Sequence, residues 1–190
     1  MLLKFAKLFE EIQKQPKLDK SSAGFKKVGR DMLTAMGHME ELKPKVQREL
    51  GMHTAAAAAV SIDRLSITDP GTLGLLGTGH QSVFQLEAAL RVRSFDEVMI
   101  WNRSGRELQK HLAMAEYYGV RCREGKLEEV VRESQVIITI TSCFEPLFPS
   151  QWVNGGTHIA AMGTDTKGKQ ELDPALSLRA ERFTDEIAQS

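Results

Sequence analysis

The stretch Leu73–Ser82, with the sequence LGLLGTGHQS, constrains the fold of this chain more than any other. It predicts a short buried strand, a glycine turn and the start of a helix, because apolar residues then recur at helical spacing as far as Leu90. Gly77 permits a tight turn, Gly79 lets the backbone approach a ligand, and Ser82 is small enough for close packing of helix on strand. The first amide groups of such a helix bind anions. The stretch therefore predicts a cradle for the pyrophosphate of a dinucleotide.

Strand-like apolar runs alternate with helical patterns from residue 72 onward. The predicted strands are Leu73–Leu76, Val98–Trp101, Val120–Cys122, Val136–Thr141 and Thr157–Met162, with Glu181–Thr184 as a candidate last strand. The predicted helices are Gln81–Val92, Arg106–Tyr118, Leu127–Arg132 and Asp173–Ala180. This alternation predicts an α/β fold, a Rossmann-type doubly wound parallel sheet with helices on both faces.

Residues 1–50 differ in character from the rest of the chain. They contain two amphipathic stretches, each ended by a proline, and predict a helical N-terminal segment. Residues 51–190 are then the NAD(P)-binding Rossmann domain. Thr54 is predicted to cap a helix that runs through Leu65, because threonine is a good N-cap residue and the alanines that follow it favour a helix.

Charge and cysteine content limit the partners of the chain. Its 25 basic and 25 acidic residues give a formal net charge of +0, which argues against nucleic acid as a main partner. Cys122 and Cys143 have no metal-ligand spacing, so no metal site is expected, and two reduced cysteines fit a cytoplasmic protein. No apolar run approaches the length of a membrane span, and residues 1–12 lack the apolar core of a signal peptide.

Ligands of parallel α/β sheets bind at the carboxyl ends of the strands, so the residues that follow the strands are the site candidates. The candidate cofactor-binding residues at the first, fourth and fifth strands are Gly77, Thr78, Gly79, His80, Gln81, Thr141, Ser142 and Met162. Asp165, which follows the fifth strand, is a candidate general acid or base, although its loop-like surroundings also suit an ordinary turn. Two histidines are expected outside the site: His158 begins its strand, and His111 lies on a helix and is expected to be exposed.

The second strand is followed by Asn102, Arg103 and Ser104, which bear on the choice of dinucleotide. Sheets that bind NAD usually carry an acidic residue here for the ribose 2′-hydroxyl. A carboxylate would repel a 2′-phosphate, whereas an amide, a guanidinium and a hydroxyl would bind it. These residues therefore favour NADP(H) over NAD(H); the alternative is that Arg103 is only a solvated loop cation.

Several stretches, taken in order from Gly51 to Ala188, resemble the ornithine cyclodeaminase/mu-crystallin family. They are His53-Thr-Ala-Ala, Gly77-Thr-Gly-His-Gln-Ser, Trp101-Asn-Arg-Ser, Val136–Ser142, Gly155-Gly-Thr-His-Ile-Ala-Ala-Met-Gly-Thr-Asp, Gly168-Lys-Gln-Glu-Leu-Asp and Asp185-Glu. The resemblance implies a Rossmann domain that binds NAD(H) or NADP(H), and a homodimer. It also implies hydride transfer at the C–N bond of a small amino acid or cyclic imine.

Three residues take roles from this resemblance. Asp165 matches the family's proton donor and acceptor, and Gln81 matches its glutamine in the phosphate-binding turn. His53 stands where the family has an arginine that helps to anchor substrate or cofactor.

Two functions stay open at this point. The first is an NADP(H)-dependent oxidoreductase of amino acids or imines, in which Asp165 transfers the proton. The second is a truncated dinucleotide-binding module with little or no catalysis that acts through partners. The second is motivated by His53 and by residues 1–50, which do not match the family's N-terminal substrate domain.

Overall fold

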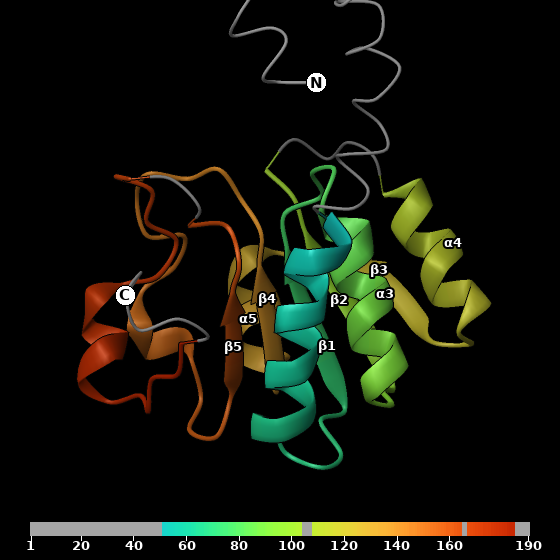
Figure 1. Ribbon diagram of the computed structural model, residues 1–190, viewed down its shortest axis with the longest axis horizontal. Coiled ribbons are helices and arrows are strands. Elements are labelled where there is room, and N and C mark those ends of the chain that lie inside the picture. The colour runs from blue at the N-terminus through green and yellow to red at the C-terminus, as the bar shows by residue number, and fades with distance from the viewer. Residues whose placement is uncertain (1–50, 104–107, 165–166, 185–190) are drawn as a thin grey trace, which may run out of the picture. The chain divides into compact units, whose positions relative to one another are not determined.

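The computed structural model describes residues 51–103, 108–164 and 167–184 (Figure 1). Within them, five parallel strands form one sheet in the order β3-β2-β1-β4-β5. The strands are β1 (Thr72–Leu76), β2 (Glu97–Trp101), β3 (Arg121–Glu124), β4 (Val136–Thr139) and β5 (His158–Ala161). The five main strand predictions are therefore confirmed, with ends that differ by at most about two residues. The strand order reverses between β1 and β4, which is where such sheets bind ligands.

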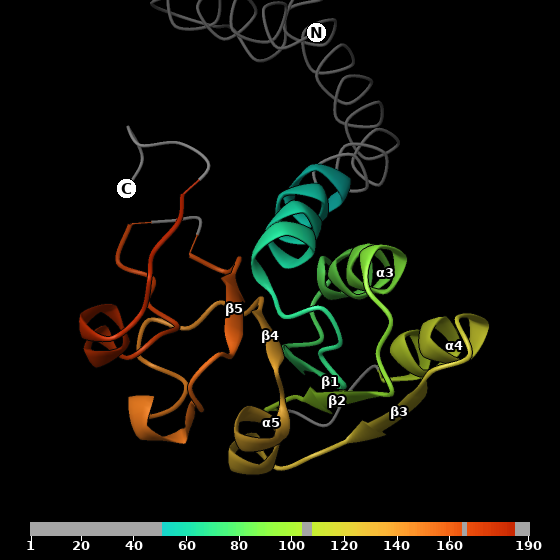
Figure 2. The same cartoon turned by 90° about the horizontal axis from the view of Figure 1, so that it is seen from below.

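Helices cover both faces of the sheet. They are α3 (Ser82–Val92), α4 (Gln109–Tyr117) and α5 (Leu127–Glu133), together with a helix whose described part covers residues 51–65. Figure 2 shows the helix over residues 51–65, α3 and α4 on one face and α5 on the other. The doubly wound α/β architecture predicted from the sequence is thus confirmed. No helix among the described residues is long and apolar enough to span a membrane.

Two apolar clusters, one on each face, hold these layers together. Leu73 and Leu75 of β1 pack in one cluster with Leu86 of α3. Leu76 belongs to the other cluster, with Val130 of α5. Because successive side chains of a strand point to opposite faces, a strand covered on both sides is apolar throughout. This is why β1, β2 and β4 could be recognised as continuous apolar runs.

The prediction of a last strand at Glu181–Thr184 is wrong. These four residues are exposed and pair with no strand of the described sheet. Only Phe183 among them is a large apolar residue, so the segment has little to bury against a helix layer. The segment predicted as the helix Asp173–Ala180 is helical, but it forms the short 3₁₀ helix η2 (Pro174–Leu178). Asp173 caps η2 by accepting a hydrogen bond of 2.9 Å from the Ala175 amide.

Thr54 does not cap a helix, because residues 51–53 already lie within the helix that contains it. Tertiary packing continues the helix beyond its local capping signal. A Cβ atom added at Gly51 would lie 2.6 Å from Cδ2 of Phe84 on α3, so the two helices are in close contact there. The helix runs to residue 65, as expected. The helical segment predicted over residues 1–50 lies outside the described residues.

Candidate functional site

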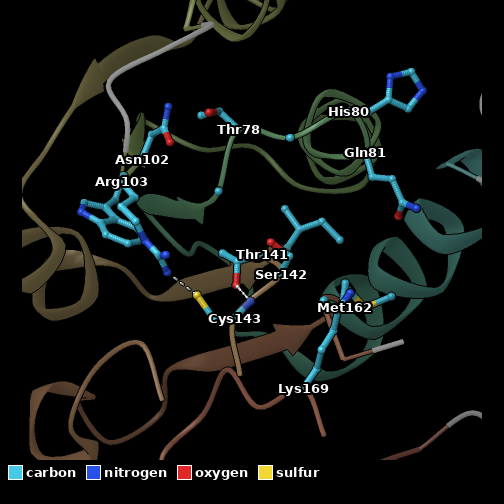
Figure 3. Close-up of a pocket in the computed structure, with 15 residues that line it drawn as sticks. Thr78, His80, Gln81, Asn102, Arg103, Thr141, Ser142, Cys143, Met162 and Lys169 are labelled. Atoms are coloured by element: carbon cyan, nitrogen blue, oxygen red, sulfur yellow. Dashed lines mark hydrogen bonds between the residues drawn. The ribbon is translucent and has the colours of Figure 1, made fainter. Parts of the chain in front are cut away.

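A cleft of about 580 Å³ opens at the carboxyl ends of β1, β2, β4 and β5 (Figure 3). The structure places ten predicted site residues along it: Gly77, Thr78, Gly79, His80, Gln81, Asn102, Arg103, Thr141, Ser142 and Met162. Five lining residues were missed by the sequence reasoning: Trp101, Ile140, Cys143, Gly163 and Lys169. All five lie within or near the segments that follow the strands, so a wider window at each strand end would have included them.

The turn between β1 and α3 contains two glycines with different surroundings. Gly77 has φ +110°, a conformation that glycine adopts readily, and a Cβ there would lie 2.6 Å from the carbonyl oxygen of Ile140. Its amide donates to the carbonyl oxygen of Trp101 at 2.9 Å, so the turn lies against both neighbouring strand ends. A Cβ at Gly79 would meet no atom of the chain within 4 Å. Gly77 is therefore required by the fold, whereas Gly79 leaves open space in the cleft.

The N-terminus of α3 faces this open space. Gln81, its N-cap residue, makes no side-chain capping hydrogen bond, and the first turn of α3 contains no acidic residue. The first amide groups of a helix have no partners within the helix and carry partial positive charge. The end of α3 can therefore accept an anion at the glycine turn.

His111 is buried, so the prediction that it is exposed is wrong. It lies on α4 with 1% of its surface exposed, and its Nε2 atom lies 2.7 Å from Oγ of Ser82. Ser82 Oγ donates its only hydrogen to the carbonyl oxygen of Gly79, at 2.6 Å, and therefore accepts from Nε2–H of His111. Ser82 is fully buried, as close packing requires, and also links α4 to the glycine turn. A signal for this existed, because His111 and Ala115, four residues apart, share the buried face of α4.

The segment after β2 reaches across the cleft to the segment after β4. Arg103 is exposed, and its Nη2 atom donates to Sγ of Cys143 at 2.7 Å (Figure 3). Asn102 is half-buried beside it. Ser104, the third residue predicted here, lies outside the described residues.

Glu171 joins the ends of β4 and β5, and sequence reasoning did not select it as a site residue. Its carboxylate is fully buried and accepts hydrogen bonds from Thr139 Oγ1 (2.7 Å), Thr141 Oγ1 (2.6 Å), the Thr141 amide (2.6 Å) and the Gly163 amide (2.9 Å). A Cβ at Gly163 would clash with this carboxylate. The Gly168–Asp173 motif contains Glu171, but no local pattern marks one of its acids as buried.

The remaining predicted residues lie apart from the cleft or outside the described part. His53 is exposed on the helix over residues 51–65 and does not line the cleft. Asp165 lies outside the described residues, which end at 164 and resume at 167. His158 begins β5, as predicted, and its Nε2 lies 3.2 Å from Ser61 Oγ. Burial lowers the pKa of His158.

Among the described residues, no group of three or more histidine, cysteine, aspartate or glutamate side chains could hold a metal ion. Cys122 is half-buried, and its burial raises the pKa of the thiol to about 11. The thiol therefore stays protonated at neutral pH.

Comparison with known sequences identifies relatives of this chain. Residues 50–190 match a family model described as "Ornithine cyclodeaminase/mu-crystallin family". Iminosuccinate reductase of Paracoccus denitrificans (strain Pd 1222) is 50% identical over 139 residues, which cover 73% of this chain and 43% of that protein. Ketimine reductase mu-crystallin of Mus musculus is 32% identical over 132 residues, or 70% of this chain and 42% of that protein. The chain thus spans less than half the length of either relative.

Solved structures of two relatives also match the fold of this chain. The crystal structure of the Paracoccus denitrificans iminosuccinate reductase in complex with NAD+ matches with a TM-score of 0.69 and 50% identity, over 72% of this chain and 42% of that one. An archaeal alanine dehydrogenase dimer with bound NAD matches with a TM-score of 0.68 and 33% identity, over 72% and 42% of the two chains.

Proposed function

The chain belongs to the ornithine cyclodeaminase/mu-crystallin family, and on that basis we propose that its cleft binds a nicotinamide dinucleotide for hydride transfer at the C–N bond of an amino acid or its imine. The observation that carries the proposal is the turn between β1 and α3. It combines a helix N-terminus that lacks a side-chain cap with a glycine whose missing side chain leaves open space.

The residues of the cleft fit such a dinucleotide. Gly79 and the first amides of α3 would hold the pyrophosphate, because a negatively charged group could approach the backbone there without a clash. The residue after β2 faces the adenosine ribose in sheets of this topology, which assigns Asn102 and Arg103 to that half. The nicotinamide half would then lie beside Thr141, Ser142 and Met162, at the ends of β4 and β5. When bound, the nicotinamide ring supplies or accepts the hydride.

Proton transfer is assigned to Asp165, on the strength of its match to the family motif and its place in the chain. It falls between Gly163 and Lys169, both of which line the cleft. A carboxylate in this segment could give a proton to the nitrogen of an imine as hydride adds to its carbon. His53 is exposed away from the cleft lining, and its role at the substrate stays a prediction.

The choice between the two dinucleotides depends on the segment after β2. The amide of Asn102 and the charge of Arg103 favour the 2′-phosphate of NADP(H), which is our prediction. Two solved relatives contain NAD, and in this chain a 2′-phosphate would compete with Cys143 for the Arg103 guanidinium. Parallel titrations with NADH and NADPH test the prediction: binding of NADPH about tenfold tighter supports it, and tighter binding of NADH overturns it.

The substrate class follows from the family and from the names of the relatives. The names of two relatives, an iminosuccinate reductase and a ketimine reductase, both specify the reduction of an imine. We therefore expect reduction of small imino acids, which form from a 2-oxo acid and ammonia or by cyclisation. We also expect a homodimer, since the solved archaeal alanine dehydrogenase is a dimer, and a cytoplasmic location. Light scattering measures the molar mass and therefore tests for the dimer.

The central experiment substitutes the open glycine and compares it with a matched control. Gly79→Ala adds a Cβ where the chain leaves space, and Gly155→Ala does the same at an exposed site away from the cleft. Overpacking of a close contact costs about 1–3 kcal/mol, so we expect G79A to weaken dinucleotide binding by about tenfold or more. G155A is expected to bind as the wild type does. Equal affinities in all three proteins would contradict the proposed cradle.

Turnover separates an enzyme from a binding module. Oxidation of NADH or NADPH is followed in the presence of ammonia with small 2-oxo acids, and separately with a cyclic ketimine. Binding without turnover on any of these substrates would favour the module. Turnover that disappears in Asp165→Asn, while dinucleotide affinity is retained, would support the role given to that residue.

A further inference from the structure

The carboxylate of Glu171 lies directly behind the cleft wall at the ends of β4 and β5. Two of its partners, Thr141 and Gly163, line the cleft, whereas Glu171 itself is fully buried and does not. Its Oε1 atom accepts from the amide and the hydroxyl of Thr141. Its Oε2 atom accepts from the hydroxyl of Thr139 and the amide of Gly163.

These contacts are those of an ionised carboxylate. Both amides can only donate, and each oxygen of Glu171 receives two hydrogen bonds, so an ionised, acceptor-only group fits all four contacts. Each of the four donor groups is neutral, so their dipoles stabilise the charge without cancelling it. The fold therefore holds the Glu171 carboxylate in a fully buried position, where screening of its charge by water and salt is weak.

The position of this charge relative to a bound dinucleotide follows from the topology. The glycine turn after β1 would hold the pyrophosphate, and the segment after β2 would hold the adenosine ribose. The other half of the molecule, which ends in nicotinamide, would then lie against the wall formed by Thr141, Met162 and Gly163. That is the wall to which Glu171 is hydrogen-bonded.

We propose that Glu171 favours the oxidised cofactor over the reduced one. This inference rests on the proposed function. The nicotinamide ring carries a positive charge when oxidised and none when reduced. A fixed anion behind the ring therefore stabilises the first form and leaves the second nearly unaffected. Glu171 acts here as a positioning residue for the ends of β4 and β5. Its charge also acts on the nicotinamide ring through the electric field, without contact with the cofactor.

Lys169 provides a charge of opposite sign in the same cleft. It is two residues from Glu171 and lines the cleft itself, and its side chain extends toward Met162 (Figure 3). A cation at this wall disfavours the oxidised ring. The two residues should therefore shift the balance between the cofactor forms in opposite directions.

The test measures the dissociation constants of both cofactor forms for each variant. Glu171→Gln removes the charge and keeps the size of the side chain, and we expect the ratio of the oxidised to the reduced dissociation constant to rise by about fivefold. Glu171→Asp keeps the charge and disturbs the contacts, so both constants can rise while their ratio stays near that of the wild type. Lys169→Met is expected to lower the ratio.

The outcomes separate three explanations. An unchanged ratio in folded E171Q overturns the inference, and so does an equal change in E171D, which would mark a purely structural role. Should E171Q fail to fold, K169M still tests whether charge at this wall acts on the ring: an unchanged or raised ratio contradicts the inference, and a lowered ratio supports it. Failure of the wild-type protein to bind either form overturns the proposed function itself.

Discussion

At the scale of single residues, two serine–histidine pairs can be compared directly. Ser82 and Ser61 each donate to the carbonyl oxygen three residues earlier and each contact Nε2 of a histidine. The pair of Ser82 and His111 is buried at 2.7 Å, whereas that of Ser61 and His158 is half-buried at 3.2 Å. Burial decides how much such a pair contributes, because water can replace a lost partner only at the second site.

We predict that Ser82→Ala lowers the free energy of unfolding by about 1–3 kcal/mol, the cost of removing a partner from a buried polar group. Ser61→Ala should cost about 1 kcal/mol or less, because its histidine remains accessible to water. Urea denaturation of both variants measures the difference. Equal losses of unfolding free energy in the two variants would contradict a buried hydrogen bond between Ser82 and His111.

At the scale of elements, the approach of α5 to β1 depends on a residue without a side chain. A Cβ at Gly74 would lie 2.5 Å from Ser134 Oγ and 3.1 Å from Val130 Cγ1. The Ser134 hydroxyl is held in place by a 2.6 Å hydrogen bond to the carbonyl oxygen of Val130. A methyl group at this position of β1 therefore requires the Ser134 side chain to break its hydrogen bond or the helix to move away from the sheet.

We predict that Gly74→Ala destabilises the fold by about 1–3 kcal/mol, the usual cost of overpacking. The double variant Gly74→Ala/Ser134→Ala should recover part of this loss, because it removes the nearest atom. Thermal and urea unfolding of the single and double variants test the coupling. Additive losses would show that Ser134 is not the obstacle.

The elements also show which kinds of prediction the sequence supports. β1, β2 and β4 were predictable because strands covered on both faces are apolar throughout. The residues of the cleft were predictable because parallel topology brings strand ends together. Three specific contacts were not predictable: His111 with Ser82, Cys143 with Arg103 and Glu171 with Thr139 join residues 29, 40 and 32 positions apart, and only tertiary packing brings them together. At Thr54 and at Glu181–Thr184 a local signal was present but misled. Tertiary packing continues the helix through Thr54, whereas the exposed segment Glu181–Thr184 forms no strand.

At the scale of the whole molecule, the cleft joins four strand ends, so a ligand that binds there links segments far apart in sequence. Binding to the folded state alone stabilises a protein by mass action. A ligand in this cleft should therefore stabilise the sheet as a unit rather than one loop.

We predict that the preferred dinucleotide, at one hundred times its dissociation constant, raises the free energy of unfolding by about 2.7 kcal/mol. The melting temperature should rise accordingly, and the G79A variant should require a proportionally higher concentration for the same rise. Calorimetry with and without ligand measures both. An equal shift in wild type and G79A at the same ligand concentration would place the binding site elsewhere.

The two glycines of the turn after β1 also predict how the gene tolerates change. Gly77 is constrained by its backbone angle and by the carbonyl oxygen of Ile140, so every replacement should be eliminated when variants are selected for folded protein alone. A Cβ at Gly79 would meet no atom within 4 Å, and replacements there should survive that selection and disappear only when ligand capture is demanded. A saturation library screened in both ways would therefore distinguish, at two positions separated by a single residue, what the sheet requires from what its ligand requires.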